Sequence, residues 1–345
     1  GIPDYRLPQD KLDADIDFIL STGIEVHTGV SIGRDISFAE IENQYDAVYI
    51  SIGAHNDKKI GIPGEDAVGV HSAVQLLRDI GEGRVPDFKG KRVCVIGGGN
   101  VSMDATRTAI RLGASAVTCV YRRRVTDMTA LAEEIEEAQS EGCQILSLQA
   151  PDHIETDETG RVTALWTRPQ VIGAYGKDGR PRPYDADQPL LRTPCDVVIV
   201  AIGQSIDAKP FEQIAPVVRG KIQAESDAFV PITPHVFAGG DTVTGPATVI
   251  RAVAAGKVAA ANIDAHLGFR HVIKSDVEIP APHLTNMPAC GRIELRSRPA
   301  EECVGNFDLV KCGMTEQEVH QETSRCLRCD HFGYGIFKGG RSSKW

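Results

Sequence analysis

A glycine-rich turn offers the clearest chemistry in the sequence. The run Gly97-Gly98-Gly99-Asn100-Val101-Ser102 follows an apolar stretch, 91–96, and precedes a stretch of helical character, 103–112. Such a turn lets backbone N–H groups and a helix N-terminus approach a pyrophosphate, which side chains would block. Ser102 stands where the usual pattern has a third glycine, and it is small enough for close helix–strand packing. Together with a second strand at 116–121, the turn predicts nucleotide binding rather than an ordinary glycine turn.

Three consecutive arginines, Arg122, Arg123 and Arg124, follow that second strand. An NAD site usually has an acidic residue here, which holds the ribose 2′-hydroxyl. Guanidinium groups instead fit a phosphate with two parallel hydrogen bonds. The sequence therefore predicts NADP(H) as the cofactor, with NAD(H) as the alternative. The other interpretation is a solvated basic patch that pairs with Glu133 or Glu136.

A second glycine turn, Gly239-Gly240-Asp241, follows the apolar run 235–238 and precedes a helix start near Thr248. Its backbone could approach a flavin pyrophosphate while Asp241 accepts a hydrogen bond from a ribityl hydroxyl. The following helix N-terminus would favour negative charge on a reduced flavin. Alone, the pattern is equally typical of a β-turn followed by a capped helix.

The last cysteines suggest a third kind of chemistry. Cys326 and Cys329 form a C-x-x-C pair, the spacing of a redox disulfide or of half an iron–sulfur site. Cys290, Cys303 and Cys312 could add ligands, but their spacing is not that of a compact ferredoxin motif. We favour a pair of reduced thiols, and the histidines show no metal-binding spacing.

An internal repeat shows which elements must position these residues. The segment 46–53 matches 196–203, with Asp, Val, Ile and Gly at the same offsets. Upstream, 23–26 corresponds to 142–145, and both are predicted to be a helix end that leads into a strand. The chain therefore contains two copies of one domain plan. In the second copy Gly97 precedes Gly142 by 45 residues, whereas only 22 residues precede Gly23. We expect the glycine turn of the first copy to lie before Gly1, and this chain alone to hold FAD poorly.

The predicted fold is α/β, with two dinucleotide-binding, Rossmann-like domains. The nicotinamide domain, 89–203, is inserted in an FAD domain made of 1–88 and 204–270, and 271–345 form a tail or docking segment. Within the inserted domain we expect a helix at 127–141, antiparallel strands between 161 and 192, and a long loop or hairpin tip at 173–189.

Composition excludes several functions. The 345 residues carry a net charge of −10, which argues against a nucleic-acid partner. The longest apolar run, 197–202, is far shorter than the roughly 20 residues of a membrane span. Nine cysteines are too few for a disulfide scaffold and odd in number, which predicts a protein of the reducing cytoplasm.

Several motifs, in their order along the chain, together resemble the glutamate synthase small-subunit family. Its relatives include the flavin subunits of electron-bifurcating transhydrogenases and the flavin part of dihydropyrimidine dehydrogenase. The resemblance covers about residues 1–268 and rests on these segments: Gly1-Ile2-Pro3-Asp4-Tyr5-Arg6-Leu7-Pro8, Ile60-Gly61-Ile62-Pro63-Gly64-Glu65, Gly97 to Asp104, Tyr121-Arg122-Arg123, Val200-Ala201-Ile202-Gly203-Gln204 and Phe237-Ala238-Gly239-Gly240-Asp241.

The resemblance implies FAD in the outer domain and NAD(P)H in the inserted one. Residues implied to contact FAD are Ile52, Gly53, Ala54, Gly239, Gly240 and Asp241. Residues implied to lie along the nicotinamide cofactor are Gly97, Gly98, Gly99, Asn100, Val101, Arg122, Arg123 and Gly203. The family's iron–sulfur segment would precede Gly1.

The implied reaction needs no catalytic side chain in the strict sense. Hydride passes from NAD(P)H to the flavin, and the electrons pass to the iron–sulfur centre or flavin of a partner subunit or domain. Two alternatives remain. One is a disulfide-type reductase that uses Cys326 and Cys329, and the other is a non-catalytic scaffold that keeps only the nucleotide-binding fold.

Overall fold

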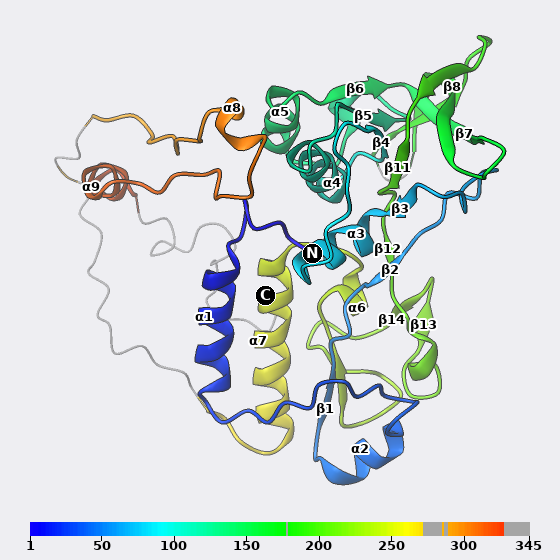
Figure 1. Ribbon diagram of the computed structural model, residues 1–345. Coiled ribbons are helices and arrows are strands. Elements are labelled where there is room, and N and C mark those ends of the chain that lie inside the picture. The colour runs from blue at the N-terminus through cyan, green and yellow to red at the C-terminus, as the bar shows by residue number, and fades with distance from the viewer. Residues whose placement is uncertain (177–178, 272–284, 286–288, 328–345) are drawn as a thin grey trace. The chain divides into compact units, whose positions relative to one another are not determined.

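The computed structural model describes residues 1–176, 179–271, 285 and 289–327 (Figure 1). These residues divide into two compact units. Unit 1 holds the described residues of 1–24, 57–204 and 296–312, and unit 2 holds those of 25–56, 205–295 and 313–345. Residues 57–88, which the sequence analysis assigned to the FAD domain, therefore group with 89–203. The short strands β2 (Asn56–Asp57) and β12 (Gln204–Ser205) pair where the chain passes between the units.

A five-stranded parallel sheet forms the centre of unit 1, in the order β3-β11-β4-β5-β6. Side chains alternate between the faces of a strand, so Val93 and Val95 of β4 enter one apolar core while Cys94 and Ile96 enter another. Both faces are therefore covered, which is typical of a parallel sheet. The strands are β3 (Val70–Ser72), β4 (Arg92–Ile96), β5 (Ala116–Tyr121), β6 (Gln144–Ser147) and β11 (Val197–Val200).

The helices of this sheet are α3 (Ala73–Gly81), α4 (Asn100–Arg111) and α5 (Ala132–Ser140), with a 3-10 turn, η1 (Val125–Asp127). Residues of α3 and α4 fill the core that Val93 and Val95 enter. The helix expected at 127–141 begins only at Ala132, so its predicted start was wrong. The N–H groups of Thr129 and Ala130 donate to Gly98 O at 2.8 and 3.0 Å, so this backbone is bound to the glycine turn before α5 begins.

An antiparallel sheet covers part of the other face and contributes Ile154 and Leu165 to the second core. Its strands are β7 (Gln149–Thr156), β8 (Val162–Tyr175), β9 (Pro181–Asp185) and β10 (Leu191–Pro194). Of the long loop and the hairpin tip expected as alternatives at 173–189, the structure has the hairpin, in which β9 pairs with the far end of β8. Its prolines, Pro181 and Pro183, suit an edge strand, because a residue there can lack the N–H that a central strand would need for its ladder.

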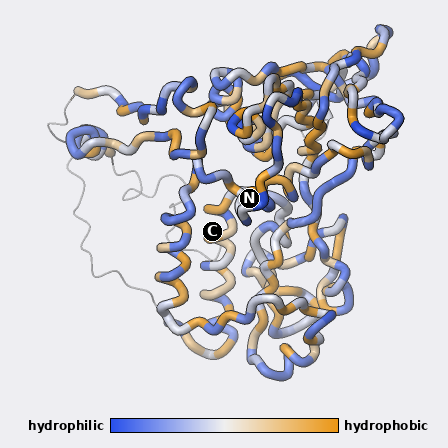
Figure 2. Tube along the Cα trace, viewed as in Figure 1, coloured by the Kyte–Doolittle hydropathy of each residue, from blue (hydrophilic) through white to orange (hydrophobic). Residues whose placement is uncertain are grey.

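The beginning of the chain and part of the predicted tail also belong to unit 1. Tyr5 is fully buried and packs with Cys303 and Val310, and the N–H of Val310 donates to Tyr5 O at 3.0 Å. Two short helices, α1 (Gln9–Leu20) and α8 (Ala300–Cys303), lie in these segments. No residue of α1 is buried, and apolar and polar residues alternate along it in Figure 2.

Unit 2 is built around a parallel pair, β1 (Val48–Ile50) and β15 (Val236–Ala238). Its core includes Ile50, Phe211, Ile222 and Val236. The remaining elements are α2 (Phe38–Gln44), η2 (Lys209–Phe211), β13 (Val217–Val218), β14 (Lys221–Ile222), α6 (Asp241–Thr244), α7 (Val249–His266) and α9 (Glu316–Ser324).

The strand expected after Gly23, at 24–26, does not form, so that prediction was wrong. A strand exists only through its ladder, and β1 and β15 pair with each other rather than with these residues. Elsewhere in the repeat the strands at 48–50 and 197–200 do form, inside the two matching segments. No helix among the described residues has the length and apolar character to cross a membrane.

Candidate functional site

The glycine turn joins β4 to α4 at the carboxyl edge of the parallel sheet. Gly97 is buried, has a φ of +149°, and donates its N–H to Val120 O at 3.0 Å. A Cβ at this position would lie 2.3 Å from Ala201 O. No side chain fits there, so the fold itself requires glycine at position 97.

Gly98 is constrained by a tyrosine rather than by open space. A Cβ at this position would lie 2.5 Å from Cε2 of Tyr121, the last residue of β5. From the sequence alone, side chains in this turn are predicted to block the approach of a pyrophosphate. For Gly98 the obstacle is instead the Tyr121 ring, which packs directly against the turn.

Gly99 differs from both of its neighbours. It is the N-cap residue of α4, its φ is −105°, and the nearest atom to a Cβ would be Thr129 Oγ1 at 3.4 Å. Neither backbone conformation nor packing of the chain requires glycine there. An N-cap position without a side chain leaves the space in front of the helix N-terminus open to an anion.

The first turn of α4 is fixed by polar contacts. Ser102 is fully buried, and its hydroxyl donates to Ala201 O at 3.2 Å and accepts the N–H of Gly99 at 3.3 Å. Asn100 accepts the N–H of Leu131 at 3.0 Å through its side chain. The N–H groups of Asn100 and Val101 belong to the first helical turn, which has no acceptor within the helix. They are the groups that could bind a pyrophosphate.

The three arginines after β5 have three different environments. Arg123 is buried and its Nε donates to Pro181 O at 2.7 Å. Arg124 pairs with Asp127 at 2.8 Å, and the hydrogen bonds with Asp127 and Tyr175 raise the pKa of its guanidinium. Arg122 is exposed and makes no hydrogen bond or ion pair with a described residue. Of the three, Arg122 is the one whose guanidinium is available to a phosphate.

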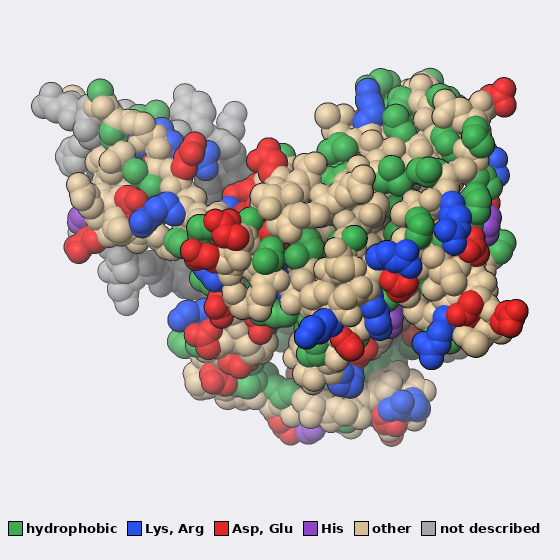
Figure 3. All heavy atoms as spheres, turned by 45° about the horizontal axis from the view of Figure 1, so that its top comes forward, with side chains coloured by type: hydrophobic (Ala, Val, Ile, Leu, Met, Phe, Trp, Pro, Cys, Tyr) green, Lys and Arg blue, Asp and Glu red, His purple; other side chains and the backbone are tan. Residues whose placement is uncertain are grey.

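Acidic and basic side chains are interspersed on the face of the molecule shown in Figure 3, so that face is not broadly basic.

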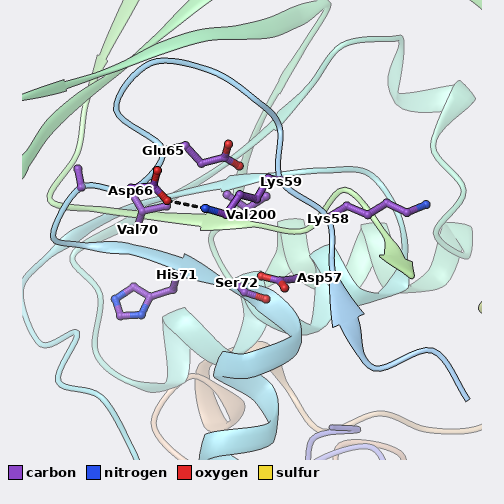
Figure 4. Close-up of a pocket in the computed structure, with 10 residues that line it drawn as sticks. Asp57, Lys58, Lys59, Glu65, Asp66, Val70, His71, Ser72 and Val200 are labelled. Carbon is purple, nitrogen blue, oxygen red and sulfur yellow. Dashed lines mark hydrogen bonds and ion pairs between the residues drawn. The ribbon is translucent and has the colours of Figure 1, made fainter. Parts of the chain in front are cut away.

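A pocket of about 270 Å³ lies beside the carboxyl ends of β3 and β11, where Ser72 and Val200 line it (Figure 4). Lys59 and Asp66 form an ion pair across it at 2.6 Å, and Lys58 extends away from that pair. Its other lining residues are Asp57, Glu65, Ala67, Val70 and His71. Burial lowers the pKa of His71, and the charge of Lys91 lowers it further. Sequence reasoning missed this pocket: Glu65 and Val200 lie in segments that carried the family resemblance, but no residue pattern there indicated a ligand site.

Gly203, the remaining nicotinamide-site prediction, lies beside this pocket. It follows β11, is exposed, and has a φ of +118°. A Cβ there would lie 3.9 Å from Cδ of Lys58. The structure thus places the predicted residues of unit 1 at the carboxyl ends of neighbouring strands, β4, β5 and β11. Ligands of open α/β sheets bind at that edge, where the strand order reverses.

The residues predicted to contact FAD gather at the ends of β1 and β15 in unit 2. Ile52, Gly53 and Ala54 follow β1, and the N–H of Gly53 donates to Thr242 Oγ1 at 2.9 Å. Gly239 follows β15 and donates its N–H to Ile50 O at 3.2 Å. Each predicted set is therefore hydrogen-bonded to a residue near the other set, Thr242 for Gly53 and Ile50 for Gly239.

The backbone of this second turn requires glycine. Gly240 has a φ of +67° and a ψ of −151°, and a Cβ at Gly239 would lie 2.4 Å from the Tyr49 hydroxyl. Asp241 begins α6, and its carboxylate accepts the N–H of Ala247 at 3.1 Å. Thr248 is the N-cap residue of α7 but makes no side-chain cap, so the helix N-terminus presents backbone N–H groups.

The cysteine pair of the tail is only half described. Cys326 is exposed, whereas Cys329 lies outside the described residues. Among the described residues no group of three or more histidine, cysteine or acidic side chains is arranged to hold a metal ion.

Residues 8–256 match the sequence family described as pyridine nucleotide-disulphide oxidoreductase. The chain belongs to this family. Its members are FAD-dependent NAD(P)H oxidoreductases, and the α/β fold class with dinucleotide-binding domains is confirmed.

Two curated relatives illustrate the likeness. The NADP(+)-dependent formate dehydrogenase subunit beta of Moorella thermoacetica is 34% identical over 98% of this chain and 50% of its own length. The putative glutamate synthase [NADPH] small chain of Cereibacter sphaeroides is 31% identical over 80% of this chain and 69% of its own length. The resemblance to the glutamate synthase small-subunit family is thereby confirmed. The chain spans about half the length of the first of these relatives.

Among solved structures, FprA of Mycobacterium tuberculosis in complex with NADPH aligns with a TM-score of 0.62 and 19% identity. The alignment covers 77% of this chain and 74% of that one. At this identity the likeness concerns the fold alone.

Proposed function

We propose that the chain carries the hydride-transfer part of an FAD-dependent NAD(P)H oxidoreductase. In this proposal unit 1 binds NAD(P)H and unit 2 contributes to FAD binding. The observation that carries the proposal is the open N-cap at Gly99, placed at the carboxyl edge of a parallel sheet, with the exposed Arg122 at the end of the next strand.

The residues of unit 1 fit a phosphorylated dinucleotide. The N–H groups of Asn100 and Val101 would bind the pyrophosphate, helped by the positive end of the α4 dipole. Gly97, Gly98 and Gly99 would let the backbone approach it. Arg122 would bind the 2′-phosphate, which favours NADP(H) over NAD(H). In this arrangement the nicotinamide end lies toward Gly203 and the pocket beside it.

The residues of unit 2 fit part of a flavin site. The glycines at 53, 239 and 240 leave the strand ends free of side chains, and Asp241 offers a carboxylate oxygen for a ribityl hydroxyl. When both are bound, NAD(P)H supplies a hydride that FAD accepts. The residues of the chain then bind, orient and exclude water, and we assign none of them an acid–base step. The domain boundaries at 88/89 and 203/204 stay a prediction.

Electrons are proposed to leave the flavin toward a partner subunit or domain. Several relatives are named as subunits, among them the NADPH-Fe(3+) oxidoreductase subunit beta of Geobacter sulfurreducens. In this proposal the chain's flavin accepts two electrons as a hydride, and an iron–sulfur centre of the partner accepts them from the flavin. A cytoplasmic location is part of the same proposal.

Changing Arg122 to Gln is expected to weaken NADP(H) binding by about 10-fold, because one charge-assisted hydrogen-bonding group is lost. NAD(H) has no 2′-phosphate, so its affinity should stay within about twofold. Isothermal titration calorimetry of each nucleotide against the parent and variant chains measures both.

Arg192 to Gln serves as the control, because it removes one exposed arginine that pairs with Glu155 at 2.7 Å, away from β5. Equal affinities of the parent for the two nucleotides would contradict the NADP(H) preference. A parent chain that binds neither nucleotide would favour the non-catalytic scaffold instead.

A further inference from the structure

A buried carboxylate lies one helical turn behind the glycine turn. Asp104 is in α4, which begins at Asn100, and its side chain is 7% exposed. At 1.5 Å per residue Asp104 is about 6 Å from Asn100 along the helix axis, and helical side chains tilt toward the N-terminus. A negative charge there repels an anion that binds to the N–H groups of Asn100 and Val101.

Arg6, in the segment before α1, neutralises this carboxylate. Its Nη1 donates to both carboxylate oxygens of Asp104, at 2.8 and 2.9 Å. Its Nη2 lies 2.9 Å from Oε1 of Glu134, a residue of α5. All three side chains are largely buried, so solvent ions screen their charges less than they screen charges on the surface.

The neighbouring residue, Tyr5, anchors this segment independently of the ion pair. Tyr5 is fully buried, and its hydroxyl donates to the backbone oxygen of Asp104 at 3.4 Å. Its ring centroid lies 3.9 Å from Cζ of Arg111, and its carbonyl accepts the N–H of Val310 at 3.0 Å. The segment should therefore stay docked on α4 when only the side chain of Arg6 is changed.

The other arginines on this side of α4 are used elsewhere. Arg107 and Arg111 both pair with Glu141, at 2.7 and 2.5 Å. Of the described residues, Arg6 alone forms an ion pair with Asp104. The counter-charge of Asp104 therefore comes from a part of the sequence that is 98 positions away.

We propose that Arg6 is a positioning residue of the nucleotide site: it neutralises Asp104, so that the N-terminus of α4 can bind the cofactor's pyrophosphate. The inference rests on the proposed function and adds to it a residue that does not touch the cofactor. NADP(H) and NAD(H) share the pyrophosphate. Arg6 therefore affects the two nucleotides equally, whereas Arg122 affects NADP(H) alone.

The test removes the ion pair from each side in turn, and calorimetric titration measures NADP+ and NAD+ binding. In Arg6→Gln, Asp104 keeps its charge without a counter-charge, whereas Glu134 keeps Arg107 at 3.2 Å. Both nucleotides should then bind about 10-fold more weakly. In Asp104→Asn the negative charge is gone, so both should bind at least as tightly as they bind to the parent.

The opposite signs separate an electrostatic role from a structural one, because both variants lose the same ion pair. Weaker binding by Asp104→Asn as well as by Arg6→Gln would show that the pair only supports the fold, and would overturn the inference. The double variant with both changes should regain the parent's affinity to within about twofold. If Arg6→Gln alone does not fold, the double variant and Asp104→Asn decide, and weaker binding by either overturns the inference.

Two further chains complete the experiment. Arg192→Gln removes an exposed arginine that pairs with Glu155, so it should leave both affinities unchanged. A parent chain that binds neither nucleotide would overturn the proposed function. A parent that binds both, together with undiminished binding by Arg6→Gln, would overturn only the role of Arg6.

Discussion

Replacing Gly99 by valine is expected to abolish nucleotide binding while the protein still folds. Gly99 has a φ of −105°, which valine adopts without strain, and a Cβ there has no neighbour closer than 3.4 Å. A branched side chain at the N-cap would, however, occupy the space in front of Asn100 and Val101. Loss of their two hydrogen bonds to the pyrophosphate should weaken NADP(H) binding on the order of 100-fold or more.

The measurement is calorimetric titration with NADP+, accompanied by a thermal melting curve. Gly81→Val is the matched control, because Gly81 ends α3 and a Cβ there has no atom within 4 Å. The control should bind NADP+ like the parent. Undiminished binding by Gly99→Val would remove the α4 N-terminus from the site.

The other turn glycines should behave differently. At Gly97 and Gly98 an added Cβ would lie 2.3 Å from Ala201 O and 2.5 Å from the Tyr121 ring. Alanine at either position must shift backbone or ring, so the melting temperature should fall together with affinity. Only Gly99 is expected to separate binding from stability.

Changing Glu141 to Gln is expected to destabilise unit 1 by about 3 kcal/mol, because it leaves the buried Arg111 guanidinium without a counter-charge, whereas Arg107 keeps its ion pair with Glu137 at 2.6 Å. Glu141 accepts hydrogen bonds from Arg107 at 2.7 Å and from Arg111 at 2.5 Å, and all three side chains are at most 3% exposed. Tyr5 closes the cluster, with its ring centroid 3.9 Å from Cζ of Arg111. Urea unfolding of parent and variant measures the difference.

Glu82→Gln is the control, since Glu82 pairs with Arg78 at 3.1 Å on an exposed helix end. Exposed pairs contribute about 1 kcal/mol or less, so this variant should unfold close to the parent. A loss in Glu141→Gln no larger than in Glu82→Gln would mean that the buried network does not stabilise the unit.

Comparing the parent with Glu141→Gln also predicts the direction in which the stability difference changes with pH. Burial alone would raise the pKa of Glu141, but the hydrogen bonds from Arg111 and Arg107 outweigh it, and the folded-state pKa is lowered. A lowered pKa contributes stability above the unfolded-state value and loses it as pH falls through the folded-state value. The difference between parent and Glu141→Gln should therefore be constant at neutral pH and shrink in acid.

The sequence by itself determined the strongest local features. The apolar run 91–96, the glycine turn and the strand at 116–121 are fixed by local periodicity and by the steric demands of glycine, so β4 and β5 lie where they were predicted, while α4 begins three residues earlier than predicted, at Asn100. The repeat likewise located β1 and β11. Motif order along the chain pointed to the family, because nucleotide-binding turns keep their residue types wherever the same backbone approach is needed.

Only the tertiary structure decided which residues of these motifs are available to a ligand. Nothing in the run Arg122-Arg123-Arg124 distinguishes its members. In the structure Arg123 donates to Pro181 O and Arg124 pairs with Asp127, so Arg122 is the member available to a ligand. Gly98 and Gly99 look equivalent in sequence and differ because Tyr121 packs against one of them. The contact of Arg180 with the Tyr121 hydroxyl carries no local signal either. It joins residues 59 positions apart, and such contacts are set by the pairing of β8 with β9 rather than by local residue pattern.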